Sequence, residues 1–153
     1  MKEKSRPGDP FYIENLTDYA SYITLMNYVD VYVSDNGVDY VLHEKIDQYT
    51  PIMLKPNGRI YLAMDIHRRE QINFGLNTTI LIHTKCNIGG DISWLGFYDP
   101  EKGKAGPVYD ISDYPYMWRR LFKRNEKLID ASDLVMPATK LSEHCYQSMF
   151  SYC

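Results

Sequence analysis

The stretch Leu54–His83 constrains the fold of this chain more than any other. A Pro-Asn-Gly turn leads into Arg-Ile-Tyr-Leu at 59–62, which predicts a short strand. Residues 65–71 predict one or two turns of helix with consecutive His, Arg and Arg, and 73–75 predict a second turn. The β-branched run 78–83 predicts another strand. Strand, short helix and strand therefore follow one another with little connecting chain.

Several positions of this stretch fit the pattern K-x-x-G-R-I-x-[IL]-P-x-[ED]-[IL]-R-[RK]-x-[LI]-x-[IL]-x-x-G. They are Lys55, Gly58, Arg59, Ile60, Leu62, Asp65, Ile66, Arg68, Ile72 and Gly75. The pattern resembles that of the AbrB-like (SpoVT/AbrB, swapped-hairpin) DNA-binding family, and the resemblance covers residues 54–98. Three positions depart from it: Ala63 replaces a proline, His67 replaces one of two adjacent arginines, and Glu70 replaces an apolar helix residue.

The resemblance implies a small barrel completed by two chains, and hence a homodimer that binds double-stranded DNA. It implies that the DNA-binding residues are Lys55, Arg59, His67, Arg68 and Arg69. Cations there would neutralise backbone phosphates, and arginine would read guanine edges. The residue types alone also fit an ordinary solvated helix face, on which Asp65 pairs with Arg68 or Arg69.

A second basic surface is expected on a helix over residues 114–129, which begins at an Asp cap with a proline in its first turn. Its cations are Arg119, Arg120, Lys123, Arg124 and Lys127. A basic amphipathic helix binds nucleic acid, a membrane surface or an acidic protein. The alternative is a helix that packs Trp118 and Phe122 into the core and leaves a charged outer face.

The remaining elements are predicted from local patterns. Helical spacing of apolar residues predicts a helix from about Leu16 to Tyr28. Asn36-Gly37 between two alternating runs predicts a hairpin of strands 28–33 and 38–43. Residues 83–91 are predicted as a loop, 92–98 as a strand, and 138–150 as a last amphipathic helix.

Composition limits the classes of function. The net charge of −3 excludes a globally basic nucleic-acid binder, so any DNA-binding face must be a local patch. No apolar run is long enough to span a membrane, and the N-terminus lacks the apolar centre of a signal peptide. An odd number of cysteines, three, without framework spacing favours a reduced, cytoplasmic setting.

Metal binding and catalysis are weakly indicated. His83 and Cys86, with the adjacent pair His144-Cys145, offer four possible zinc ligands, but adjacent residues rarely bind one tetrahedral ion. Unrelated polar loops and a buried thiol explain them as well. No nucleophile-elbow pattern surrounds a serine, and no phosphate-binding loop is present. We therefore expect no enzyme activity, no metal and no cofactor.

These observations predict an α+β fold, with an antiparallel sheet or small swapped-hairpin-like barrel and flanking helices. The expected parts are a flexible N-terminus (1–10), a core (11–98), a linker or long loop (99–107) and a helical segment packed on the core (108–153). The expected function is DNA binding, as a transcriptional regulator or architectural protein. The alternative is a small non-enzymatic interaction module, such as a viral or accessory protein that inhibits a host protein.

Overall fold

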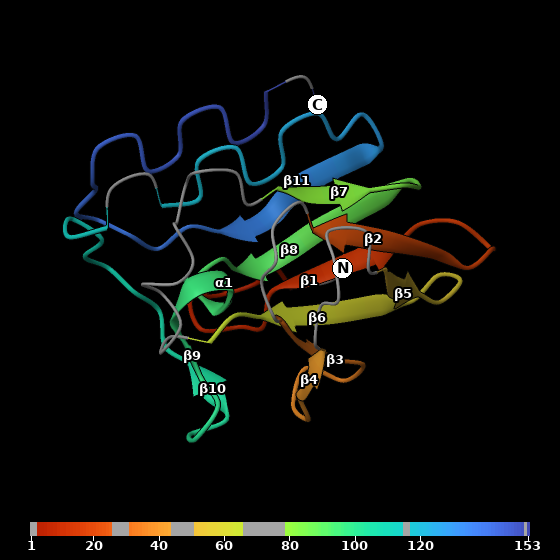
Figure 1. The fold of residues 1–153 in the computed structure, drawn as a ribbon, viewed down its shortest axis with the longest axis horizontal. Helices are drawn as coiled ribbons and strands as arrows, with labels where there is room; N and C mark the ends of the chain where they lie inside the picture. The colour runs from red at the N-terminus through yellow and green to blue at the C-terminus, as the bar shows by residue number, and fades with distance from the viewer. Residues whose placement is uncertain (1–2, 26–30, 44–50, 66–78, 115–116, 152) are drawn as a thin grey trace.

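The structure is a computed structural model that describes residues 3–25, 31–43, 51–65, 79–114, 117–151 and 153. Nearly all of the regular structure in these ranges is β (Figure 1). The single helix in the described residues, α1, covers only Trp94–Phe97. The prediction of an α+β fold with flanking helices is therefore wrong. No helix in the described ranges has the length and apolar character needed to span a membrane.

The larger sheet has six strands in the order β11-β8-β1-β6-β3-β4. In that order the strands are Leu128–Val135, Cys86–Asp91, Tyr12–Asn15, Arg59–Ala63, Val31–Ser34 and Val41–His43. Neighbouring strands are antiparallel, except that β11 runs parallel to β8. Strands from both ends of the chain therefore meet in one sheet.

A second sheet has three antiparallel strands in the order β5-β2-β7. They are Ile52–Leu54, Ser21–Leu25 and Ile80–Ile82. A small hairpin of β9 (Tyr98–Asp99) and β10 (Lys104–Ala105) projects from the body (Figure 1). This hairpin occupies most of the segment that was expected to be a linker or long loop.

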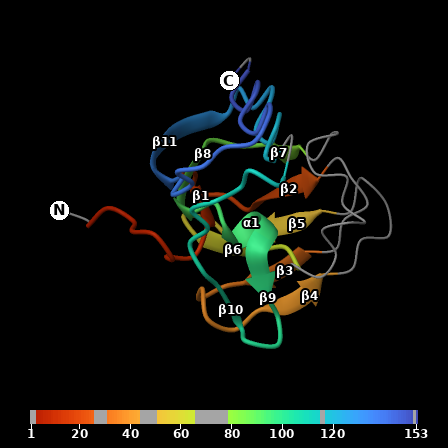
Figure 2. The same cartoon turned by 90° about the vertical axis from the view of Figure 1, so that its left-hand side faces the viewer.

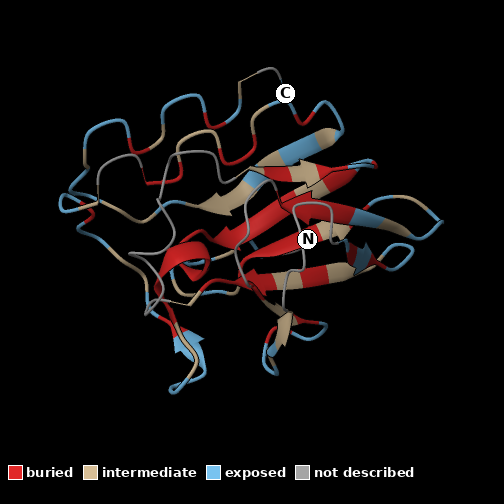
Figure 3. Cartoon of the chain, in the orientation of Figure 1, coloured by how far each residue is buried: buried red, intermediate tan, exposed pale blue. Residues whose placement is uncertain are grey.

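The core is one continuous cluster of buried side chains. They come from both main sheets and from residues 117–122, among other segments (Figure 3). Alternation along the strands explains which side chains enter it, because successive residues point to opposite faces. On β1, Ile13 is fully buried in the core, while Tyr12 and Glu14 lie on the opposite face. Their partners on β6 repeat this pattern, so Arg59 and Tyr61 share the outer face.

Asn15, which is 1% exposed, joins the two sheets where β1 turns into β2 and β5 turns into β6. Its amide nitrogen donates to the carbonyl oxygens of Tyr19 (2.9 Å) and Lys55 (3.2 Å). Its side-chain oxygen accepts from the backbone nitrogen of Thr17 at 2.9 Å. These bonds connect the buried asparagine to backbone groups outside the strands of both sheets, so it is a structural residue.

Three predicted strand regions are confirmed in the described residues. The hairpin is present as β3 and β4, although its connection is longer than a two-residue Asn-Gly turn and only Gly37 has positive φ. The strands predicted at 59–62 and 78–83 are present as β6 and β7. The predicted short helix at 65–71 and turn at 73–75 lie, after Asp65, outside the described residues.

Three other local predictions are wrong. The helix predicted from Leu16 contains strand β2 instead, because both edges of that strand are paired. The loop predicted at 83–91 contains β8, the strand between β1 and β11. The strand predicted at 92–98 is mostly α1, whose start is fixed by a bond from the Ser93 nitrogen to Asp91 Oδ1 at 2.8 Å.

The two predicted C-terminal helices are also wrong. Residues 117–124 and 143–151 form successive turns that lie side by side above the sheets (Figure 1). Backbone nitrogens of Arg120, Phe122 and Arg124 donate to carbonyls of the second segment at 2.8–3.1 Å. Positive φ angles at Trp118, Arg120, Arg124, His144 and Ser148 interrupt any helical path. Backbone hydrogen bonds between these two segments therefore take the place of hydrogen bonds within a helix.

Candidate functional site

The structure describes only part of the first predicted DNA-binding set. His67, Arg68 and Arg69 lie outside the described residues. Lys55 Nζ lies 3.7 Å from Asp35 Oδ2, with both side chains well exposed. Arg59 is bonded to Glu14, its cross-strand partner on β1. The two described cations therefore each face a carboxylate, which weakens the phosphate-binding role expected of them.

Arg59 is held in place by two contacts on the outer face of the larger sheet. Its Nε donates to Glu14 Oε2 at 2.7 Å, and its guanidinium carbon lies 3.9 Å from the centre of the Tyr12 ring. Burial acts to lower the pKa of Arg59, but the hydrogen bonds to Glu14 and Tyr61 outweigh it and raise that pKa. Arg59 is therefore a fixed, charged group.

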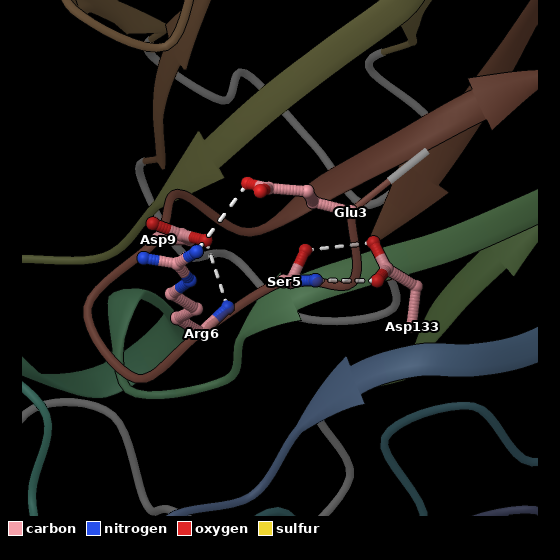
Figure 4. Close-up of polar contacts among 5 residues, drawn as sticks. All are labelled: Glu3, Ser5, Arg6, Asp9 and Asp133. Atoms are coloured by element: carbon pink, nitrogen blue, oxygen red, sulfur yellow. Dashed lines mark hydrogen bonds and ion pairs between the residues drawn. The ribbon is translucent and has the colours of Figure 1, made fainter. Parts of the chain in front are cut away.

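Asp133 on β11 also lies on the outer face of the larger sheet, and its carboxylate accepts three hydrogen bonds from uncharged groups. The backbone nitrogen and hydroxyl of Ser5 each donate to it at 2.7 Å, as Figure 4 shows. The Tyr12 hydroxyl donates to its Oδ2 at 2.6 Å. Burial would raise the pKa of Asp133, but these bonds and the nearby Arg59 charge lower it overall. Burial, followed by the bond to Asp133, raises the pKa of Tyr12.

Gly89 makes the contact between Tyr12 and Asp133 possible. It pairs with Tyr12 on one side of β8 and with Asp133 on the other. A Cβ atom at Gly89 would collide with the Tyr12 ring and lie 2.6 Å from Asp133 Oδ2. The tyrosine ring therefore crosses the strand only because residue 89 has no side chain.

These groups line a groove of about 770 Å³ between the N-terminal residues and the outer face of the larger sheet. Its lining residues are Glu3, Lys4, Ser5, Arg6, Asp9, Pro10, Tyr12, Glu14, Arg59, Tyr61, Asn87, Ser132 and Asp133. Of these, only Arg59 was predicted as a functional residue. Tyr12, Ser5 and Asp133 were missed because their pairing joins residues far apart in the sequence.

The second predicted basic surface lies on the paired turns at the top of Figure 1. Its members are Arg119, Arg120, Lys123, Arg124 and Lys127, which we call the 119–127 basic surface. Desolvation, followed by repulsion from Arg120, Arg124 and Arg119, lowers the pKa of Lys123. Three of the other four cations therefore lie close enough to Lys123 to act on its charge. They come from turns and not from the helix that was predicted.

The residues considered for zinc do not form a cluster. His83 lies on the outer face of the smaller sheet, where its Nε2 is 3.0 Å from Thr24 Oγ1 and its ring stacks on Tyr22. Cys86 is fully buried on β8, and burial raises the pKa of its thiol to about 12. His144 Nε2 lies 3.1 Å from Glu143. Among the described residues, no three His, Cys, Asp or Glu side chains gather as metal ligands.

An exposed apolar pair lies on the outer face of the smaller sheet. Tyr22 and Met53 are cross-strand partners and are 41% and 61% exposed. Trp94, by contrast, is buried, and it stacks with Tyr40 and Tyr98. The exposed pair is thus the better candidate for contact with another protein.

No family model, curated protein or solved structure matches this chain. The resemblance to the AbrB-like family therefore stands on its sequence pattern alone.

Proposed function

We propose that the protein binds double-stranded DNA through the 119–127 basic surface, as a transcriptional regulator or architectural protein. The observation that carries the proposal is that Arg119, Arg120 and Arg124 all lie close enough to Lys123 for their charges to help lower its pKa. Like charges held close together raise the local potential, and an anion such as a phosphate backbone relieves their repulsion. Residues 117–127 contain one acidic residue, Glu126, against these cations and Lys127.

The site proposed from the basic surface differs from the one implied by the family resemblance. Arg59 and Lys55 face Glu14 and Asp35, so a phosphate there meets carboxylates as well as cations. The basic surface lies on the outside of the molecule, with Arg124 and Lys127 exposed. This arrangement gives electrostatic binding without strong base selectivity, because phosphate contacts carry no sequence information.

The test is fluorescence anisotropy with a labelled duplex of mixed sequence over a range of salt. We expect the wild-type affinity to fall steeply as salt rises. Replacing both Lys123 and Arg124 by alanine is expected to reduce the slope of log K against log salt by about 2 and to weaken low-salt binding about tenfold. The two substitutions leave the buried residues of this segment in place.

A matched control removes two lysines from the projecting β9–β10 hairpin. Lys102 and Lys104 are exposed, so Lys102→Ala with Lys104→Ala changes the net charge equally. This hairpin lies at the opposite side of the molecule from the basic surface in Figures 1 and 2. The proposal would be contradicted if both double variants lost the same affinity for the duplex, or if the wild-type affinity did not depend on salt concentration.

Two further predictions accompany this one. A cytoplasmic location is supported by three cysteines that are all free thiols. A homodimer stays a prediction, and the mass of the protein in solution with and without duplex DNA checks it.

The second candidate is a non-enzymatic module that binds and inhibits another protein, favoured by the exposed pair Tyr22 and Met53. Aromatic and methionine side chains at an interface centre contribute much of the binding energy. Tyr22→Ala with Met53→Ala is expected to lower recovery of a specific partner in affinity capture about tenfold. Val38→Ala, at an exposed apolar residue in the β3–β4 connection, is the control. Unchanged recovery with the paired variant would exclude this face.

A further inference from the structure

The groove on the outer face of the larger sheet takes no part in the proposed DNA binding. It lies between residues 3–6 and strands β1, β6, β8 and β11, and its volume of about 770 Å³ is in the range of small-ligand sites. Figure 2 shows that the N-terminal residues extend outward beside this face. One wall of the groove is therefore formed by residues 3–6, whereas the other is a sheet.

The groove is lined by charged groups of both signs. Arg59 is bonded to Glu14 at 2.7 Å, and its charge also helps to lower the pKa of Asp133. An anionic ligand would meet both carboxylates, and a cationic ligand would meet Arg59. The open face of the Tyr12 ring is already covered by the Arg59 guanidinium. This arrangement favours a neutral ligand that forms hydrogen bonds.

The hydrogen-bonding pattern at Asp133 indicates the groups that such a ligand carries. Ser5 offers Asp133 two adjacent uncharged donors, one N–H and one O–H, one to each carboxylate oxygen. Two neighbouring hydroxyl groups of a sugar present the same pair of donors. The Ser5 nitrogen and hydroxyl therefore make the two hydrogen bonds to Asp133 that a diol would make.

A second acceptor in the groove lacks a donor. Asn87 lines the groove, and its Oδ1 is buried with no hydrogen-bond partner in the described part of the chain. A buried acceptor without a partner costs stability, so a donor that reaches it is bound favourably. Arg6, Lys4 and Ser132 add further polar groups around the rim.

We propose that this groove binds a neutral polyhydroxylated ligand of the carbohydrate class. Two adjacent hydroxyls of the ligand take the places of the Ser5 nitrogen and hydroxyl on Asp133, and another hydroxyl donates to Asn87. The N-terminal residues 3–6 then leave Asp133. Bound ligand and bound Ser5 exclude each other at this carboxylate.

The test is a titration followed by amide NMR of the full chain with sucrose, cellobiose and N,N′-diacetylchitobiose. At least one saccharide is expected to shift the amides of Ser5 and Asn87 at millimolar concentration. Ser5→Ala is expected to tighten binding a few-fold, because one competing donor is lost. Asp133→Asn is expected to weaken binding at least tenfold, because an acceptor of paired donors is lost.

The two substitutions are expected to change saccharide affinity in opposite directions. A general loss of structure would weaken binding in both variants, so it is distinguished from a direct effect on the site. Ser112→Ala, which removes an exposed hydroxyl bonded to Asp110, is the control and is expected to leave affinity unchanged. Inorganic phosphate and spermidine test the anionic and cationic alternatives. The proposal fails if no saccharide shifts these amides, if phosphate or spermidine competes, or if Ser5→Ala weakens binding. None of these results depends on DNA binding by the 119–127 basic surface.

Discussion

Gly90→Ala is expected to destabilise the protein by about 4 kcal/mol or more. Gly90 has φ +81°, a conformation that costs a residue with a side chain about 1–2 kcal/mol. An added Cβ would also collide with the Pro10 carbonyl and lie 2.8 Å from Phe11 Cα. These are backbone atoms at the start of β1, where Phe11 is fully buried, so the neighbour cannot move without opening the core.

Chemical denaturation followed by tryptophan fluorescence measures this effect, because Trp94 and Trp118 are both buried. Two other glycines separate the contributions. Gly103 has φ +65° but open space around it, so Gly103→Ala is expected to cost about 1 kcal/mol. Gly106 has neither feature, and its replacement is expected to be nearly neutral. A loss at Gly90 no larger than that at Gly103 would mean that β8 and β1 do not pack this closely.

Gly90 also explains why β8 was not predicted as a strand. Asn87, Gly89 and Gly90 have low strand propensity, and nothing in the local sequence shows that a neighbouring backbone and a tyrosine ring need the empty space. In contrast, the β3–β4 hairpin and β6 were predicted because alternation and turn residues are local signals. Strand β2 was missed because its apolar residues also fit helical spacing, and pairing with β5 and β7 decides between the two.

The candidate site was predictable to the same limited extent. Arg59 was identified from its motif, but its partner Glu14 is 45 residues away, and that pairing replaces the expected phosphate contact by an ion pair within the chain. The 119–127 basic surface was identified because its charges are adjacent in the sequence, whatever backbone carries them. Asp133 gave no signal of its own, because its role depends on Ser5 and Tyr12, which are 128 and 121 residues away.

Phe122→Ala is expected to cost about 3–5 kcal/mol, although it lies in a segment without helix or strand. Its side chain is fully buried and stacks between Phe11 (ring centres 6.1 Å apart) and Phe150 (5.7 Å). The same residue donates its backbone nitrogen to the Met149 carbonyl at 3.0 Å. Removing the ring therefore leaves a cavity where the C-terminal turns meet the core of the sheets.

Phe150→Ala is the matched control, because that ring is 37% exposed and its loss is expected to cost about 1 kcal/mol. Fluorescence variants that keep only Trp94, beside the larger sheet, or only Trp118, in the turns, follow the two parts separately. If the turns belong to the core, both probes report one transition that Phe122→Ala shifts to lower denaturant. If Phe122→Ala left the Trp94 transition unchanged and shifted only the Trp118 transition, the turns at 117–124 and 143–151 would form a unit separate from the sheets.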